Sequence, residues 1–260
     1  MYNLTQILLI SLLTLSSCGK NSTSKTEANP PSQEEQQITP PVEVEPTEIV
    51  KINDLLPTMY YTAEEEKVAC KGKYGTSTYN GTEQSLIIDM AGKTIATVCT
   101  RFYRVLLMEG SAILKDRGQG KMGVNYSTKI GEDRRYHRLE RCVLGEGVKR
   151  DLCLLPYHTL ATDNKVHAIG EIIYIPGAAG LKLPDGTEHE GYFIVRDTGS
   201  AFNGVGAQRV DMFTGLDPDN NNAFQRAGFT HTKPMAAFKV SGKSAEVVKE
   251  KLRQRFGDLY

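Results

Sequence analysis

The sequence contains no tryptophan, and its five cysteines include no pair at the C-x-x-C spacing that is typical of structural zinc sites. It carries no excess of charge, because 31 Lys and Arg balance 31 Asp and Glu. This balance argues against a nucleic-acid partner. The sequence also has no apolar run of about 20 residues, the length that a membrane-spanning helix needs. Without tryptophan, tyrosine or phenylalanine would have to form any platform for a sugar ring.

We expect neither a metal nor another cofactor. The five histidines show no H-E-x-x-H or comparable ligand spacing. The segment "DPDNNN" at 217–222 resembles the start of a calcium loop. However, it lacks glycine at its sixth position, and Gly228 stands where such a loop has glutamate.

The N-terminus has a short apolar segment, "ILLISLLTL", followed by "LSSC". This segment is too short to span a bilayer but has the length of the apolar part of a secretory signal. Together with the cysteine, residues 1–17 resemble a bacterial lipoprotein signal peptide, after which Cys18 becomes the lipidated first residue. Because Gly19 rather than aspartate follows, the resemblance implies a lipid anchor in the outer membrane, with the protein facing the periplasm.

The next segment, 18–54, is polar and rich in proline, as in "NPPSQEEQQITPPVEVEPTE". A chain with so few apolar residues cannot bury a core, so we predict a disordered acidic tether. The tether would let a folded domain reach away from the membrane. We expect that domain at 55–243, with a final helix at 244–260.

Strand-like runs dominate the folded part, and we predict a mainly β fold. The run at 85–110, "SLIIDMAGKTIATVCTRFYRVLLMEG", predicts a hairpin that turns at Ala91-Gly92. Residues 66–155 predict a loop-rich β insertion, since the part from 115 to 156 is Gly-rich and charged. The segment "SAEVVKEKLRQRFG" predicts one C-terminal helix, with Ser244 as its N-cap and Gly257 after its end.

Four cysteines remain after Cys18, and an even number in an exported chain predicts two disulfides. A bond between Cys142 and Cys153 would close a short loop, and one between Cys70 and Cys99 a longer loop. The sequence does not fix this pairing, and free buried thiols are the alternative.

Three aspartates each follow an apolar or β-branched stretch, namely Asp163, Asp197 and Asp211. Carboxyls at the ends of neighbouring strands can converge, and close carboxyls push their pKa values apart, so that one can act as an acid near neutral pH. The alternative is that each aspartate only caps a turn. The turn "DTGS" at 197–200 is typical of aspartic proteases, but such enzymes need two copies, and this chain has one.

The order of these motifs resembles a known family. The stretches "LATDNKVHAIGEIIYIP", "DTGSAFNG" and "RVDMFTG" resemble the three-aspartate (3D) domain, and are similar to the barrel of membrane-bound lytic transglycosylase A. Upstream, "TMYYTAEEE" and "MEGSAIL" resemble segments of the same broader family. The resemblance implies a double-psi β-barrel. The chain departs from the family pattern at Asn164 and Ser200, and its loop before Asp211 is longer.

The resemblance also implies an activity, the cleavage of peptidoglycan glycan strands. Asp211 matches the catalytic acid, while Asp197 and Asp163 match the second and first aspartates of the family. The expected product carries a 1,6-anhydro-muramyl end, with one aspartate acting first as acid and then as base. We expect Glu109, Glu65 and Tyr61 to bind substrate. The alternative is that the two glutamates are exposed surface charges and that Tyr61 packs in the core. The region 66–155 would form the other side of the groove.

Two other functions stay open. A glycan hydrolase would use two carboxylates, and a non-catalytic barrel would bind peptidoglycan and organise the cell wall. In each case the partners are glycan strands and, through the anchor, the outer membrane. We expect a monomer.

Overall fold

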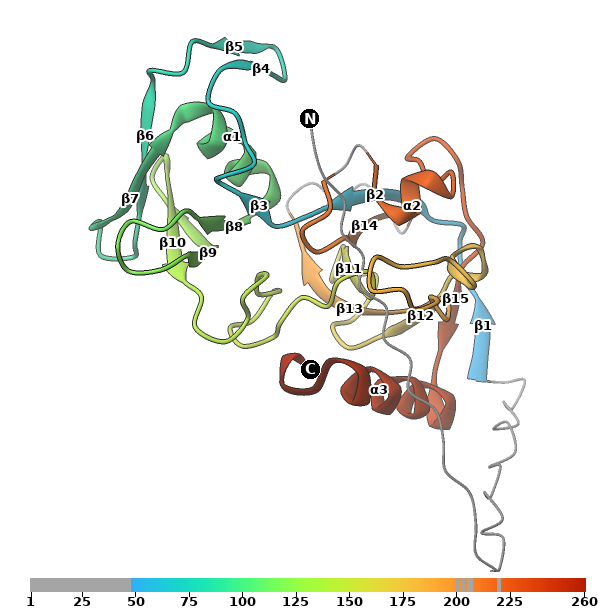
Figure 1. Cartoon of the computed structure of the whole chain (residues 1–260). Helices are drawn as coiled ribbons and strands as arrows, with labels where there is room; N and C mark the ends of the chain where they lie inside the picture. The colour runs from blue at the N-terminus through green and yellow to red at the C-terminus, as the bar shows by residue number, and fades with distance from the viewer. Residues whose placement is uncertain (1–47, 200–201, 203, 205–207, 219–220) are drawn as a thin grey trace, which may run out of the picture. The chain divides into compact units, whose positions relative to one another are not determined.

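The computed structural model describes residues 48–199, 202, 204, 208–218 and 221–260 (Figure 1). The proposed signal peptide, Cys18 and Ser200 lie outside these residues. The largest sheet has seven strands. In their order across the sheet these are β1 (Ile49–Lys51), β15 (Phe238–Val240), β12 (Ile172–Tyr174), β13 (Tyr192–Thr198), β11 (Thr159–Thr162), β14 (Arg209–Phe213) and β2 (Leu56–Tyr60).

The two strands at the ends of this order, β1 and β2, are consecutive in the chain. Between them, Leu55 forms an isolated antiparallel bridge with Met235, just before β15. No strand pair among the described residues joins β1 to β2, so the pairing does not close a full barrel. The chain therefore passes from one edge of the sheet to the other through residues 52–55. The segment 18–54, which we expected to be a tether, includes β1. These residues form a strand because their backbone pairs with β15.

The neighbouring strands β11 and β14 place side chains on two different faces of the sheet. Leu160, Val210 and Met212 share one buried cluster, whereas Ala161 and Phe213 belong to another. This separation follows from the alternation of side chains along a strand. The main core of the seven-stranded sheet lies on the first face.

Residues 63–138 form the remaining sheets. A four-stranded sheet contains β10 (Asp133–Arg138), β9 (Met122–Ile130), β8 (Ser111–Leu114) and β3 (Ala63–Glu64). Two hairpins precede β8, β4 (Gly72–Tyr74) with β5 (Ser77–Tyr79) and β6 (Gln84–Ile88) with β7 (Thr94–Cys99). The expectation of a loop-rich insertion is wrong for residues 122–138, which form a β-hairpin.

The predicted hairpin at 85–110 is confirmed in its first part and wrong in its last part. Its turn lies between β6 and β7, as expected, but β7 is followed by α1 (Thr100–Glu109). Phe102, Val105 and Leu106 are buried at helical spacing on one side of α1. Gly110 ends the helix with a left-handed φ of 83°. The aromatic and β-branched residues had suggested a strand, but their spacing favours a helix.

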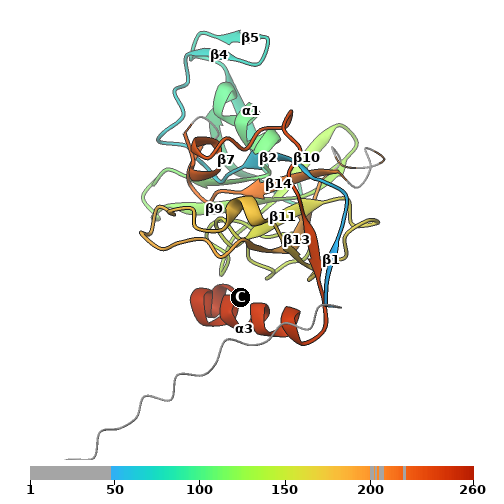
Figure 2. The same ribbon diagram turned by 90° about the vertical axis from the view of Figure 1, so that its right-hand side faces the viewer.

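The C-terminal helix α3 (Gly242–Phe256) is confirmed (Figure 2). Its buried Val248 and Leu252 pack with Ile172 and Ile194 of the sheet. Ser244 is not its N-cap. Instead, the Glu48 carboxylate accepts hydrogen bonds from the Lys243 and Ser244 N–H groups at 2.8 and 2.7 Å. A distant acid thus satisfies the free donors of the first turn.

The other short helical segments are α2 (Ala223–Arg226), η2 (Pro176–Ala178) and η4 (Gly257–Leu259). None of the helices in the described parts of the chain is both long and apolar enough to cross a membrane.

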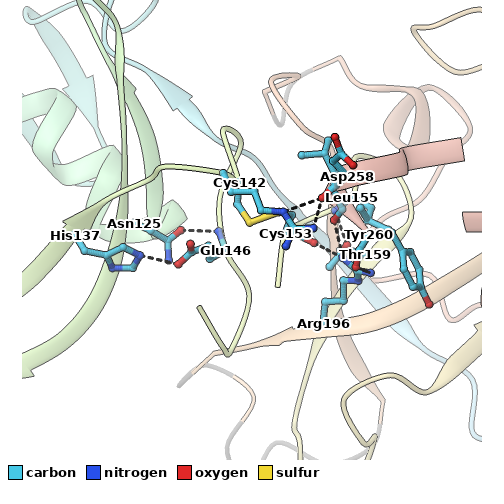
Figure 3. Close-up of a disulfide and its surroundings, with 12 residues drawn as sticks. Asn125, His137, Cys142, Glu146, Cys153, Leu155, Thr159, Arg196, Asp258 and Tyr260 are labelled. Carbon is cyan, nitrogen blue, oxygen red and sulfur yellow. Dashed lines mark hydrogen bonds and ion pairs between the residues drawn. A yellow bond between two sulfur atoms is a disulfide. The ribbon is translucent and has the colours of Figure 1, made fainter. Parts of the chain in front are cut away.

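Both predicted disulfides are present, Cys70–Cys99 and Cys142–Cys153. The second closes a short loop between β10 and β11, and the backbone of Glu146 bridges that of Cys153 within it. His137 of β10 contacts the Glu146 carboxyl, with 2.7 Å between Nε2 and Oε2 (Figure 3). The loop therefore connects β10 of the four-stranded sheet with β11 of the seven-stranded sheet.

Candidate active site

Asp197 and Asp211 lie on either side of one residue, Ala161. In the middle strand β11, Ala161 pairs with Asp197 of the parallel strand β13 and with Asp211 of the antiparallel strand β14. Residues in register across a sheet point to the same face, so both carboxyls share a face with the Ala161 methyl group. Two strand spacings separate the backbones by about 9–10 Å. A small side chain between them leaves this space to the two carboxyls.

Aromatic side chains surround this position. Tyr60, Phe202 and Phe213 form a buried cluster with Ala161 and Leu154. The ring centroids of Tyr60 and Phe213 are 5.1 Å apart. The aspartates thus lie in apolar surroundings, where an ionised carboxylate is poorly stabilised.

Burial raises the pKa of Asp197 to about 7, and the charge of Asp211 contributes to the rise. A hydrogen bond from the Thr198 N–H group, at 2.8 Å, and the polar hydroxyl of Tyr60 act in the opposite direction. Burial likewise raises the pKa of Tyr60 well above its usual range, and the charges of both aspartates raise it further. Tyr60 is therefore a neutral phenol that can donate to a carboxylate at neutral pH.

Glu109 reaches the same corner of the molecule from the end of α1. Its Oε2 accepts a hydrogen bond of 3.1 Å from the N–H group of Tyr61. Its charge is also among the causes that raise the pKa of Tyr60. The structure thus brings Glu109 and Tyr61 near Asp197 and Asp211, although these residues come from segments far apart in the sequence.

Glu65 lies in another environment. Its two carboxylate oxygens form a fork with Arg117, at 2.6 and 2.9 Å, and Oε2 also accepts from the Lys115 N–H group at 2.9 Å. The side chain is buried and fully engaged by these partners. Its substrate-binding role stays a prediction. The ion pair with Arg117 gives Glu65 a structural role.

Asp163 begins a turn directly after β11. Its Oδ1 accepts from the Lys165 N–H group at 2.9 Å, and its carbonyl accepts from Val166 and His167. Asp163 is not among the groups that shift the pKa of Asp197, and its carboxyl bonds to the turn that follows β11. The structure thus gathers two of the three aspartates and gives the first one a turn-forming contact. Its catalytic role stays a prediction.

Two features of the site were not found from the sequence. Tyr60 and Ala161 lie within the stretches "TMYYTAEEE" and "LATDNKVHAIGEIIYIP", but the sequence predicted no role in the site for either residue. Their positions depend on strand register, which pairs Ala161 with both aspartates and Tyr60 with Phe213. In the described part of the chain, no three His, Cys, Asp or Glu side chains form a group that could hold a metal ion.

Several solved structures resemble this chain at low identity. E. coli MltA with bound chitohexaose has 13% identity and a TM-score of 0.46 over 73% of this chain and 72% of its own. A membrane-bound lytic murein transglycosylase from Agrobacterium tumefaciens has 15% identity and a TM-score of 0.43 over 80% and 77%. The lytic transglycosylase LtgG of Burkholderia pseudomallei has 12% identity and a TM-score of 0.31 over 74% and 70%.

No curated protein matches the chain. A comparison with family models matches residues 158–236 to the 3D domain. These residues include Asp163, Asp197 and Asp211, whose motifs had suggested the same family. The chain therefore carries a 3D domain at residues 158–236.

Proposed function

We propose that this protein cleaves the glycan strands of peptidoglycan as a lytic transglycosylase. The observation that carries the proposal is the pairing of Asp197 and Asp211 with Ala161, in a 3D domain, with the pKa of Asp197 raised to about 7. A half-buried pair of carboxyls that still holds a proton near neutral pH can supply it to a leaving group.

In the proposed reaction, Asp211 acts twice. Because the two carboxyls are coupled, their proton belongs to the pair, and Asp211 delivers it to the glycosidic oxygen between N-acetylmuramic acid and N-acetylglucosamine. The bond from C1 to this oxygen breaks, and the leaving sugar keeps the proton as a new hydroxyl. The Asp211 carboxylate then removes the proton of the muramyl 6-hydroxyl. The 6-oxygen bonds to C1, which gives the 1,6-anhydro ring and returns the proton to the enzyme.

The neighbours have supporting roles in this proposal. Asp197 shares the proton and limits the pair to one negative charge, and the Tyr60 hydroxyl donates to Asp197 when that carboxyl is ionised. Glu109 and Tyr61 lie where they could hold sugar hydroxyls. Glu109 is also a possible second carboxylate, which keeps hydrolysis as the second candidate function.

We also infer that the seven-stranded sheet is the wall of a double-psi β-barrel. Its support is that β1 and β2 stand at opposite edges of the sheet but are consecutive in the chain. The parallel pairs β11–β13 and β14–β2, within an otherwise antiparallel sheet, further support it.

Localisation is a separate proposal that rests on the N-terminal sequence. A lipid on Cys18 would anchor the protein to the outer membrane, and the polar segment after it would let the domain reach peptidoglycan in the periplasm. Replacing Cys18 with serine should release the protein from the membrane fraction without changing its activity on isolated sacculi. A Cys18→Ser protein that still partitions with membranes would contradict the anchor.

The activity is tested with Asp211→Asn, which removes the exchangeable proton and keeps the shape of the side chain. We expect the release of soluble muropeptides from purified sacculi to fall by at least about a hundredfold, the usual scale of an acid–base contribution. Asp133→Asn, at an exposed aspartate of β10, is the matched control and should retain activity. If Asp211→Asn is as active as the wild type, Asp211 is not the acid. Sacculus binding without release by the wild type would instead favour a non-catalytic barrel.

A further inference from the structure

The direction of the Asp197 side chain does not follow from simple alternation along β13. Phe193 and Val195 both pack in the main core, on one face of the sheet. Because successive side chains of a strand alternate between faces, a regular β13 would turn Asp197 into this core. Its carboxyl would then lie on the face opposite to that of Asp211.

One extra residue changes the face. Leu160 of β11 pairs with Val195, but the next residue, Ala161, pairs with Asp197, so Arg196 has no counterpart on β11. Such a β-bulge shifts the alternation by one position and redirects the side chains that follow it. The bulge at Arg196 therefore puts Asp197 on the same face as Ala161.

The Arg196 side chain lies in a socket formed by backbone carbonyl oxygens (Figure 3). It is only 1% exposed, and Nη1 donates to the Cys153 carbonyl at 2.7 Å and to the Leu259 carbonyl at 3.2 Å. Nη2 donates to the Tyr260 carbonyl at 3.0 Å, and the guanidinium lies 4.4 Å from the centre of the Tyr260 ring. A buried guanidinium without such acceptors would be strongly unfavourable, so the socket fixes where Arg196 can be.

The backbone of Arg196 is held from the disulfide loop. Its carbonyl accepts a hydrogen bond of 3.0 Å from the Val148 N–H group. At the neighbouring Gly147, an added Cβ atom would stand 2.0 Å from the Arg196 carbonyl oxygen. Only glycine allows the loop to approach the bulge this closely.

We propose that Arg196 is a positioning residue, which holds the bulge of β13 in place and so keeps Asp197 beside Asp211. The inference rests on the proposed function for its effect on catalysis, but not for its effect on Asp197. Arg196 acts through geometry rather than charge, because its guanidinium points to the socket and is not among the groups that shift the pKa of Asp197. The disulfide loop and the residues after α3 thereby gain a role in the active site.

The test uses the full chain with Arg196→Met, which keeps much of the side-chain length and removes all donors. Carbon-13 NMR of the aspartate carboxyls should show Asp197 titrating near pH 7 in the wild type and well below it in the variant, as the carboxyl leaves its buried position. With sacculi, kcat should fall about tenfold to a hundredfold, the scale expected for a small misplacement of a reacting group. The KM should change little, and Arg196→Lys should restore part of kcat.

Arg253→Met is the matched control, since Arg253 also lies over the Tyr260 ring, at 5.0 Å, but belongs to α3 and donates to Glu250 of the same helix. It should leave both the titration and kcat unchanged. If Arg196→Met does not fold, Gly147→Ala disturbs the bulge from the backbone side and should shift the titration in the same direction. A folded variant in which Asp197 still titrates near pH 7 would overturn the inference. An inactive wild type with a shifted titration in the variant would instead overturn only the proposed function.

Discussion

At the scale of single residues, the main finding is the raised pKa of Asp197. The family resemblance matches the catalytic acid to Asp211, and the structure shows that burial raises the pKa of its neighbour Asp197 to about 7. Resemblance and structure thus point to the same pair of carboxyls, on either side of Ala161. The charge of Asp211 contributes to the raised pKa of Asp197.

The raised pKa of Asp197 has a consequence for stability. The unfolded chain releases the Asp197 proton near its ordinary pKa of about 4, while the folded chain keeps it up to about 7. Between these values the folded state binds more protons, so stability falls as pH rises, by at most about 1.4 kcal/mol per pH unit. Asp197→Asn should remove this slope and be more stable than the wild type at pH 8.

Urea unfolding at pH 5, 6, 7 and 8 measures the effect. Asp133→Asn should keep the wild-type slope, because Asp133 is exposed. Equal slopes in Asp197→Asn and the wild type would show that Asp197 is not protonated in the folded protein near pH 7.

At the scale of elements, the C-terminal helix shows why caps are hard to predict. Its amphipathic pattern predicted its existence, and its end at Gly257 was correct. The start was misplaced because the capping group, Glu48, lies almost 200 residues away in the sequence. A local search for Ser or Thr could not find it.

Glu48→Gln should lower the melting temperature at neutral pH, because a neutral amide interacts less favourably with the N-terminus of α3. Hydrogen bonds with Ser244 and Lys243 lower the pKa of Glu48, so its contribution is present above the ordinary value of 4.5 and is lost as pH falls below the folded value. The difference between variant and wild type should therefore vanish in strong acid. Glu140→Gln, at an exposed glutamate outside α3, is the control. A difference that persists in strong acid would contradict the electrostatic account.

The error at α1 has a different cause. Phe102, Val105 and Leu106 are all common in strands, yet only their helical spacing decides the structure. Similarly, the 122–138 hairpin has weak alternation, since one face of β9 carries Asn125 and Ser127 against other polar groups. Polar side chains that are satisfied by distant partners do not produce a local apolar pattern.

At the scale of the whole molecule, the disulfide pairing could be proposed from the sequence but not fixed. Prediction of the site would also have required contacts between segments that are distant in the sequence. The aspartates could be selected as a set from their motifs, but their shared face depends on the bulge at Arg196, and no single segment encodes that contact. Register and bulges arise from pairing between distant strands, and this explains why Ala161 and Arg196 escaped prediction.

The disulfide Cys142–Cys153 should contribute to overall stability, since it limits the unfolded chain. The double variant Cys142→Ser, Cys153→Ser should lose about 2–4 kcal/mol of unfolding free energy in urea. Because the loop also holds the bulge, the variant should lose activity at temperatures where it is still folded. Full activity in the folded variant would show that the loop supports stability alone.

The central claim concerns the product of the reaction. Mass spectrometry of the muropeptides released from purified sacculi by the full-length protein tests it most directly. We predict ends that carry 1,6-anhydro-muramic acid, lighter by one water than ends made by hydrolysis, and no such release by Asp211→Asn. Products with reducing muramic acid ends would contradict the account, because they require water, rather than the 6-hydroxyl, as the group that attacks C1.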